Sequence, residues 1–213
     1  MTADVTSAAP EAGFTVPFFF LRHGETTYNR DRRFQGQRDT DLSPRGRDQA
    51  AAAAAALADA PISRIVSSSL ARARITAETV AAKHGLPVET DDALMECHLG
   101  IHQGEPYAEW MPDYWRGAYA PEGGETFWTF RDRVLPAMAR AAAQPGTLIV
   151  AHGGLWYAAR SLITMAPDIA VMPNCLPLHV SPREAHWDVE ILGGANLERT
   201  VQGFGPSSDR PGA

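Results

Sequence analysis

The stretch Pro17–Asn29, PFFFLRHGETTYN, is the most informative part of this 213-residue chain. It begins with a short apolar run, which is typical of a strand buried in a sheet. Arg22 and His23 follow this run without a spacer. In open α/β sheets, ligands bind beyond the carboxyl ends of the strands. The stretch therefore predicts a strand over Val16–Arg22 whose exit presents a cation and an imidazole to a ligand.

A second stretch, GTLIVAHGG at Gly146–Gly154, repeats the pattern of apolar strand, histidine and glycine. Glycine after the histidine permits close approach of the backbone to a ligand. We therefore expect His23 and His152 to point into one crevice, whereas four other histidines are interpreted as structural: His84, His98, His179 and His186.

The rest of the chain alternates between helical and extended patterns. Ser43 followed by Pro44 is typical of a helix start, and Gly85 of a helix end. We expect helices over 43–60, 70–85, 124–143 (interrupted or bent near Pro136) and 155–166, strands over 62–70 and 146–151, and a hairpin of 176–181 with 186–192. This order predicts an α/β fold with a largely parallel sheet.

Size and composition favour a single domain. A chain of 23.0 kDa that is 45% hydrophobic can bury one sizeable core. We expect a disordered leader over residues 1–15, because they are small and polar, one domain over 16–205, and a flexible tail over 206–213. The oligomeric state cannot be predicted from these features.

Cysteine content and hydropathy indicate the compartment. Cys97 and Cys175 are too few for a disulfide framework and fit a reducing environment. The longest apolar runs are shorter than a bilayer span, and the N-terminus lacks the pattern of a signal peptide. We therefore predict a cytoplasmic protein that does not associate with membranes.

The net charge of −6 argues against nucleic acid as a partner. Arginines nevertheless crowd the segment after the first strand: Arg22, Arg30, Arg32, Arg33, Arg38, Arg45 and Arg47. Such a local excess indicates an anionic ligand. For the outer arginines, ordinary exposed surface is an equally good interpretation.

Six blocks of the sequence resemble, in order, those of the histidine phosphatase superfamily, the branch that includes cofactor-dependent phosphoglycerate mutases and their phosphatase relatives. The blocks are LRHGET with YN, RFQGQRDTDLSPRG, SSSLARARITAETV, LMECHLGIHQG, PEGGETFWTFRDRV and VAHGG. The resemblance covers about Phe18 to Gly154 and, more weakly, the terminal hairpin. It implies a three-layer α/β/α sandwich with a central, mostly parallel sheet, and phosphoryl transfer without a metal or another cofactor.

The resemblance also implies roles for particular residues. His23 corresponds to a nucleophile that forms a phosphohistidine, while Arg22, Arg72 and His152 correspond to groups that surround the phosphate. Arginine suits this task through its planar fork of donors and fixed charge. Glu96 corresponds to the residue that donates a proton to the leaving group and later accepts one from water.

Further residues at matching positions have supporting roles. We expect Asn29, Gln35 and the backbone N–H of Gly153 to contact substrate, and Glu25 and Glu125 to brace the site. The other ring nitrogen of the nucleophile needs an acceptor, for which a nearby backbone carbonyl is the natural candidate.

The segment 105–121, EPYAEWMPDYWRGAYAP, bears on the reaction. Mutases of this family typically carry a longer insertion here, so the short segment favours a phosphatase acting on a small phosphorylated metabolite. A mutase is the alternative, and a non-catalytic phospholigand-binding protein is a third. The aromatic residues of this segment form either a lid over the substrate or ordinary core.

Two features of the acidic loop (94–104) leave questions open. His102 and Gln103 stand where the family often has an aromatic residue and an acid, and His102 is a candidate substrate contact. His98, His102 and Cys97 could suggest a metal by composition, but no matching second pair exists at zinc-site spacing. We therefore predict no metal.

Overall fold

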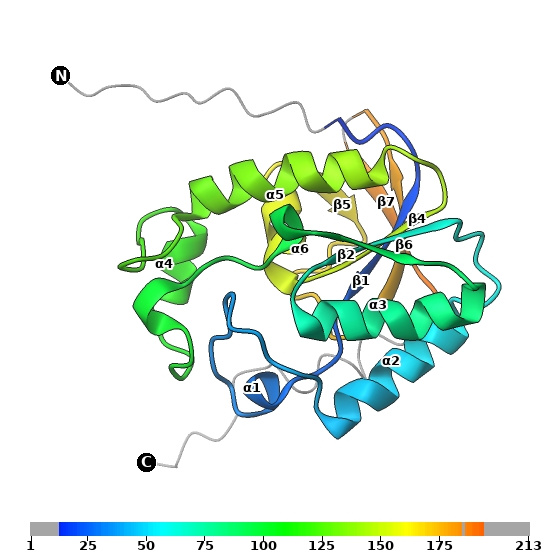
Figure 1. Ribbon diagram of the computed structural model, residues 1–213. Coiled ribbons are helices and arrows are strands. Elements are labelled where there is room, and N and C mark those ends of the chain that lie inside the picture. The colour runs from blue at the N-terminus through cyan, green and yellow to red at the C-terminus, as the bar shows by residue number, and fades with distance from the viewer. Residues whose placement is uncertain (1–12, 185, 194–213) are drawn as a thin grey trace, which may run out of the picture.

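The computed structural model describes residues 13–184 and 186–193 (Figure 1). Its described strands form one sheet in the order β3-β2-β4-β1-β6-β7-β5. They are β1 (Phe18–Arg22), β2 (Arg64–Ser68), β3 (Val88–Asp91), β4 (Thr147–Ala151), β5 (Thr164–Ala166), β6 (Pro177–Pro182) and β7 (His186–Ile191). Only β6 is antiparallel to its neighbours. The prediction of a mostly parallel sheet with a terminal antiparallel hairpin is confirmed.

Helices cover both faces of the sheet (Figure 1). On one side lie α2 (Pro44–Ala56) and α3 (Ala71–His84), and on the other α5 (Phe127–Ala142) and α6 (Gly153–Arg160). The short helices α1 (Thr27–Arg30) and α4 (Met111–Trp115), with 3-10 turns at Asp92–Leu94 and Gly100–His102, belong to the connecting segments. The predicted three-layer α/β/α sandwich is confirmed.

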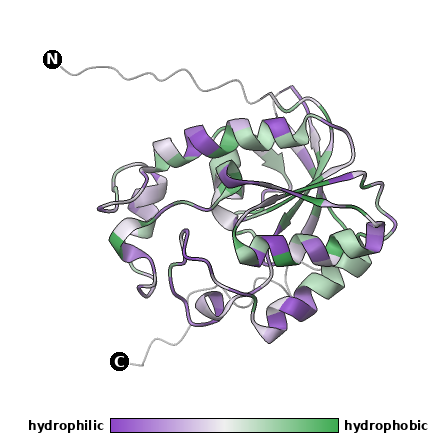
Figure 2. Ribbon diagram, viewed as in Figure 1, coloured by the Kyte–Doolittle hydropathy of each residue, from purple (hydrophilic) through white to green (hydrophobic). Residues whose placement is uncertain are grey.

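The strand β1 shows why the sheet needs two covering layers. Phe18 and Phe20 pack into the core beneath α5 and α6, while Phe19 and Leu21 pack beneath α2 and α3. Alternate side chains of a strand point to opposite faces, so an unbroken apolar run is buried on both sides. Figure 2 shows hydrophobic residues concentrated on the central strands, whereas the helices alternate between hydrophilic and hydrophobic residues.

The helix boundaries that the sequence marked most clearly are confirmed. The Ser43 hydroxyl accepts a hydrogen bond of 3.0 Å from the Gly46 N–H, with Pro44 as the first residue of α2. Gly85 ends α3 in the left-handed conformation, with φ of 64°. A side-chain cap and a glycine are the expected ways to satisfy helix ends.

Pro136 does not interrupt its helix, contrary to one of our expectations. The helix α5 is continuous from Phe127 to Ala142. Pro136 and Asp132, whose carbonyl loses its partner four residues later, are both exposed. Water can therefore satisfy that carbonyl, which reduces the cost of the proline.

The expected helix over 155–166 is wrong at both ends. The helix α6 begins at Gly153 and ends at Arg160, and Thr164–Ala166 instead forms β5, paired with β7. Ile163 and Thr164 are β-branched, and Pro167 disfavours the helical conformation for the residue before it. The edge strand β3 was not expected either, because it is short and mostly exposed.

The terminal segments are only partly described. Residues 1–12 of the expected leader and all of the expected tail at 206–213 lie outside the described residues. Phe14 was expected within the leader, yet its ring is buried against Phe18 and Trp187, at centroid distances of 5.6 and 4.8 Å. Within the described ranges, no helix is long and apolar enough to cross a membrane.

Candidate active site

Three neighbouring parallel strands deliver polar side chains to one edge of the sheet. Ser68 ends β2, His152 follows β4, and Arg22 with His23 lies at the end of β1. These strands are adjacent in the order β2-β4-β1, so their carboxyl ends meet. The rings of His23 and His152 are buried, with centroids 5.2 Å apart. The two strand–His–Gly motifs thus converge in space.

The His23 ring is held by the backbone. Its Nδ1 lies 2.7 Å from the carbonyl oxygen of Gly24, the kind of acceptor that the sequence analysis expected. Since a carbonyl can only accept, Nδ1 carries the proton and Nε2 keeps its lone pair. Burial lowers the pKa of His23 well below its ordinary value, and Arg72 and Arg22 lower it further. The ring is therefore neutral at physiological pH, as a nucleophile must be.

His152 is held from the neighbouring strand. Its Nε2 lies 2.8 Å from the Ser68 hydroxyl oxygen, and that oxygen is also 3.4 Å from the Leu70 N–H, which donates to it. Among the described residues, Nδ1 of His152 has no hydrogen-bond partner. The pKa of His152 also lies well below its ordinary value, mainly because of burial and then because of Arg72.

Two buried guanidinium groups complete the cationic side of the site. Arg22 donates from Nη1 to the Met172 carbonyl at 2.6 Å. Arg72 donates to the carbonyls of Arg38 and Gly36 at 2.9 and 2.8 Å. Burial lowers the pKa of both groups, that of Arg72 to about 10, so both are cations at neutral pH. Backbone carbonyls orient these charges without neutralising them.

Glu96 reaches the same region from the acidic loop. Its Oε2 accepts a hydrogen bond of 3.1 Å from the Gly154 N–H, and its Oε1 accepts one of 3.0 Å from the Cys97 N–H. The carboxylate also acts electrostatically on Arg22 and Arg72. The first turn of α6 thus holds this carboxylate close to the two cations.

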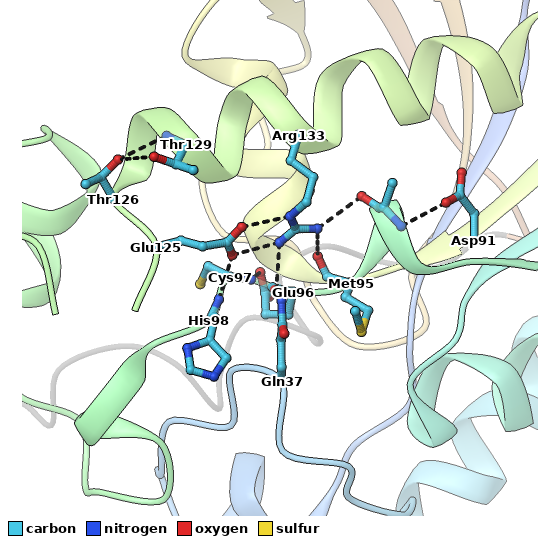
Figure 3. Close-up of polar contacts among 11 residues, drawn as sticks. Gln37, Asp91, Met95, Glu96, Cys97, His98, Glu125, Thr126, Thr129 and Arg133 are labelled. Carbon is cyan, nitrogen blue, oxygen red and sulfur yellow. Dashed lines mark hydrogen bonds and ion pairs between the residues drawn. The ribbon is translucent and has the colours of Figure 1, made fainter. Parts of the chain in front are cut away.

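Arg133 of α5 holds the acidic loop in place through hydrogen bonds (Figure 3). Its Nε and Nη2 each donate to the Glu125 carboxylate at 2.8 Å. The remaining donors bind the carbonyls of Ala93, Met95 and Glu96, at 3.1, 2.9 and 3.2 Å. Glu125 also accepts from the His98 N–H at 2.8 Å. The bracing role expected for Glu125 is thus explained by an arginine that the sequence analysis did not single out.

The remaining predicted residues divide between cavity and scaffold. Asn29, Gln35 and Gly153 line the same cavity as His23. Glu25 instead accepts a hydrogen bond of 2.8 Å from the Ser43 hydroxyl, and so braces the start of α2.

Polar residues of the loop before β6 also contribute, which the sequence analysis missed. The Asn174 side chain donates to the His23 carbonyl at 2.8 Å and lies 3.5 Å from Asn29 Oδ1. A single asparagine or a main-chain carbonyl in a loop carries no signal that distinguishes it in one sequence. Ser68 could have been noticed, because it ends a strand next to the one before His152.

The cavity has a volume of about 640 Å³. Besides His23, Arg22, Arg72 and Glu96, it is lined by side chains of the aromatic segment 105–121, including Tyr107, Met111 and Trp115. Tyr114 of the same segment is fully buried in the core. Tyr114 is thus ordinary core, whereas Tyr107 and Trp115 line the cavity. A cavity of this size accommodates a small ligand.

His102 and the cysteines do not form a second centre. The His102 ring stacks on Trp110 at 4.5 Å and its Nε2 lies 2.6 Å from the Tyr119 hydroxyl. It does not line the cavity. Over residues 13–184 and 186–193, no group of three histidine, cysteine or acidic side chains is arranged to hold a metal ion.

The fold and the histidine- and arginine-lined cavity are those of a phosphoryl-transfer enzyme. The chain belongs to the histidine phosphatase superfamily (branch 1), which it matches over residues 18–190. The family and the enzyme class predicted from the sequence, a histidine phosphatase, are thereby confirmed.

Several relatives are similar over most of their length. The chain is 41% identical over 156 residues to glucosyl-3-phosphoglycerate phosphatase of Mycolicibacterium vanbaalenii, covering 63% of this chain and 68% of the relative. It is 37% identical over 209 residues to phosphoglycerate mutase-like protein 4 of Arabidopsis thaliana, covering 87% and 90%. A solved mycobacterial glucosyl-3-phosphoglycerate phosphatase in complex with VO3 superposes with a TM-score of 0.69 at 34% identity, covering 83% of this chain and 98% of that chain.

Proposed function

We propose that this protein hydrolyses a small phosphorylated sugar derivative through a phosphohistidine on His23, without a metal ion. The observation that carries the proposal is the hydrogen bond between His23 Nδ1 and the Gly24 carbonyl. It leaves Nε2 as the free nucleophilic atom, in a buried site with Arg22 and Arg72. A ring held in one tautomer presents its free nitrogen as a nucleophile, and preorganised cations stabilise the negative charge of the transition state.

In the first step, His23 Nε2 attacks phosphorus and the bond to the leaving oxygen breaks. The charge on the transferring group is spread over its equatorial oxygens, where Arg22, Arg72 and the Nδ1–H of His152 donate hydrogen bonds. The leaving oxygen takes a proton from the Glu96 carboxyl group. The products of this step are a free alcohol, a phosphohistidine and the Glu96 carboxylate.

In the second step, water attacks the phosphohistidine. The Glu96 carboxylate takes a proton from this water, the bond between phosphorus and His23 Nε2 breaks, and inorganic phosphate leaves. The neutral ring and the protonated Glu96 are thereby restored. One carboxyl group thus acts as the acid of the first step and the base of the second. General acid–base catalysis of this kind increases the rate by roughly a hundred to ten thousandfold.

The relatives support a substrate of the kind that their names describe, glucosyl-3-phosphoglycerate. Trp115 and Tyr157 line the cavity, with ring centroids 4.4 Å apart. Aromatic side chains suit a glycosylated leaving group because sugar rings pack against aromatic faces. The cavity volume of about 640 Å³ fits a glycosylated phosphoglycerate.

A mutase is the second candidate, since relatives named as phosphoglycerate mutase-like proteins match most of the chain. A mutase must return the phosphate to bound product before water attacks. Segment 105–121, which the structure describes in full, contains a single short helix, α4. We therefore favour the phosphatase.

The decisive experiment measures phosphate release from a panel of phosphomonoesters in excess chelator. The panel includes glucosyl-3-phosphoglycerate, and 3-phosphoglycerate with its bisphosphate primer, with isomer formation followed in the same reactions. Phosphate release without isomerisation is expected. Isomerisation with little release would make the protein a mutase, and phosphate binding without turnover would make it a binding protein.

Two variants test the roles within this reaction. His23→Ala should abolish turnover and the acid-labile phosphoenzyme while the protein stays folded. Glu96→Gln should slow poor leaving groups far more than p-nitrophenyl phosphate, whose leaving group needs no proton. Equal losses on both substrates would contradict the acid role of Glu96.

The compartment is part of the same proposal. Both Cys97 and Cys175 are free thiols, which fits a cytoplasmic enzyme. Localisation of a tagged full-length chain by fractionation tests this expectation.

A further inference from the structure

Arg32 has an unusual backbone conformation for an arginine. Its φ is 53°, in the left-handed region that glycine adopts more readily. Three hydrogen bonds hold the backbone there. The Arg32 N–H donates to the Asn29 carbonyl at 3.2 Å, and two bonds of 2.8 Å run from the Arg33 N–H to the Tyr28 carbonyl and from the Tyr107 N–H to the Arg32 carbonyl. Strain of this kind persists where surrounding structure maintains it, and it is frequent at ligand sites. The arginine side chain therefore needs an explanation beyond local folding.

The Arg32 side chain is exposed and lines the cavity. Within the described part of the chain, its guanidinium makes no hydrogen bond or ion pair with protein. Its neighbours differ: Arg30 pairs with Asp31 at 2.8 Å, and Arg33 donates to the Gly104 carbonyl at 2.8 Å. Arg32 is thus a cation at the cavity whose donors are available to a ligand.

Tyr107 connects Arg32 with the phosphate-binding cations. Its backbone N–H donates to the Arg32 carbonyl, and it lines the cavity that Arg22 and Arg72 also line. Arg32 therefore lines the same cavity as the two arginines that face the phosphoryl group. A substrate whose phosphoryl group meets Arg22 and Arg72 can extend through this cavity toward the long Arg32 side chain.

We propose that Arg32 binds a carboxylate on the leaving alcohol of the substrate. The inference rests on the proposed function and narrows its substrate class to phosphorylated hydroxy acids and their glycosides. Arg22 and Arg72 already bind the phosphoryl group in the proposed reaction, so the additional cation indicates a second negative charge on the substrate. A guanidinium matches a carboxylate with two parallel hydrogen bonds, which favours this anion as its ligand.

The test compares two substrates that differ at one carbon. In 3-phosphoglycerate the group beside the hydroxyl-bearing carbon is a carboxylate, and in glycerol 3-phosphate it is a hydroxymethyl group. We expect the wild type to favour 3-phosphoglycerate in kcat/KM. Arg32→Gln should lower kcat/KM for 3-phosphoglycerate about tenfold, mainly through KM, because a charge-assisted pair is lost. Its kcat/KM for glycerol 3-phosphate should change by less than about twofold.

Three further variants separate binding from structure. Arg32→Lys should retain part of the preference, since it keeps the charge. Arg32→Gly should lose the preference without lowering Tm, because glycine accepts the left-handed backbone. Arg30→Gln, an exposed arginine paired with Asp31, should match the wild type on both substrates.

The outcomes distinguish this inference from the function on which it rests. Equal losses on both substrates in Arg32→Gln, or no preference in the wild type, would overturn the carboxylate site while p-nitrophenyl phosphate is still hydrolysed. A protein that hydrolyses neither these three phosphomonoesters nor glucosyl-3-phosphoglycerate would overturn the proposed function itself.

Discussion

The hydroxyl of Ser68 and the Nε2 of His152 lie 2.8 Å apart, at the ends of two neighbouring strands. Ser68 Oγ also accepts from the Leu70 N–H at 3.4 Å, and a hydroxyl group can donate as well as accept. We expect it to donate to Nε2, which leaves the ring proton on Nδ1, an atom with no partner among the described residues. In this tautomer His152 is a hydrogen-bond donor through Nδ1.

Ser68→Ala should therefore impair His152 without unfolding the protein. We expect kcat to fall by roughly ten to a hundredfold, as when a residue that orients a donor is lost, with a smaller change in KM. Ser67→Ala is the matched control, because Ser67 is equally buried in β2 but its hydroxyl donates to the Ser68 carbonyl. The ¹⁵N shifts of the His152 ring report the tautomer. An unchanged tautomer in Ser68→Ala would contradict this role.

The second prediction concerns the two glycines that begin α6. A β-carbon on Gly154 would overlap Glu96 Oε1, whereas one on Gly153 would meet Arg22 Nε at 3.6 Å, an ordinary contact. Gly154→Ala should therefore displace the carboxylate and reduce turnover of poor leaving groups about as much as Glu96→Gln, by roughly a hundredfold. Gly153→Ala should retain most activity. Steady-state kinetics of both variants on an alkyl phosphate and on p-nitrophenyl phosphate distinguish these cases, and equal effects of the two glycines would refute the prediction.

Much of this site was accessible from the sequence because its side chains follow strands. The apolar runs before His23 and His152 identify strands, and parallel strands bring their carboxyl ends together. Convergence of the two rings follows from that rule alone. The family resemblance added Arg72 and Glu96, whose positions in the chain do not themselves predict a place in the site.

What the sequence could not supply are contacts made through the main chain or across loops. The carbonyls that hold Arg22 and Arg72 belong to Met172, Arg38 and Gly36, and any residue type could provide them. The end of α6 was misjudged for a related reason. Thr164–Ala166 is a strand only because β7 lies beside it, which is a tertiary contact.

The third prediction tests the network of Arg133. Glu125→Gln removes the charge that balances Arg133 and weakens the attachment of the acidic loop. We expect a loss of about 1–3 kcal/mol in the free energy of unfolding, since both groups are only partly exposed. Turnover should fall most for poor leaving groups, because Glu96 is on that loop.

The control for this variant lies on the same helix. Arg140→Gln removes an exposed arginine whose ion-pair partner, 3.7 Å away, is Asp91 of β3 instead of a residue of the acidic loop. It should change stability by less than about 1 kcal/mol. If Glu125→Gln slows alkyl and p-nitrophenyl phosphates equally, the network supports the fold and does not position Glu96.

The fourth prediction follows from the buried histidines. Burial and the nearby arginines hold the pKa of His23 and His152 well below that of an unfolded chain, which is about 6.5. Below pH 6.5 the unfolded chain therefore binds protons that the folded protein does not. The contribution of the two histidines to the free energy of unfolding is fully present above that pH. It decreases as the pH falls toward their pKa values in the folded protein, by about 1.4 kcal/mol per pH unit for each histidine.

Removing one of these histidines should make this dependence shallower. Urea unfolding between pH 7 and pH 5 measures how the free energy of unfolding depends on pH in the wild type and in His152→Asn. The slope of the variant should be smaller than that of the wild type by up to about 1.4 kcal/mol per pH unit. Ser67→Ala, which keeps both histidines, should retain the wild-type slope even where its stability is lower. Equal slopes in His152→Asn and the wild type would mean that His152 binds its proton equally well in the folded and unfolded states, and that Arg72 and burial do not keep its ring neutral.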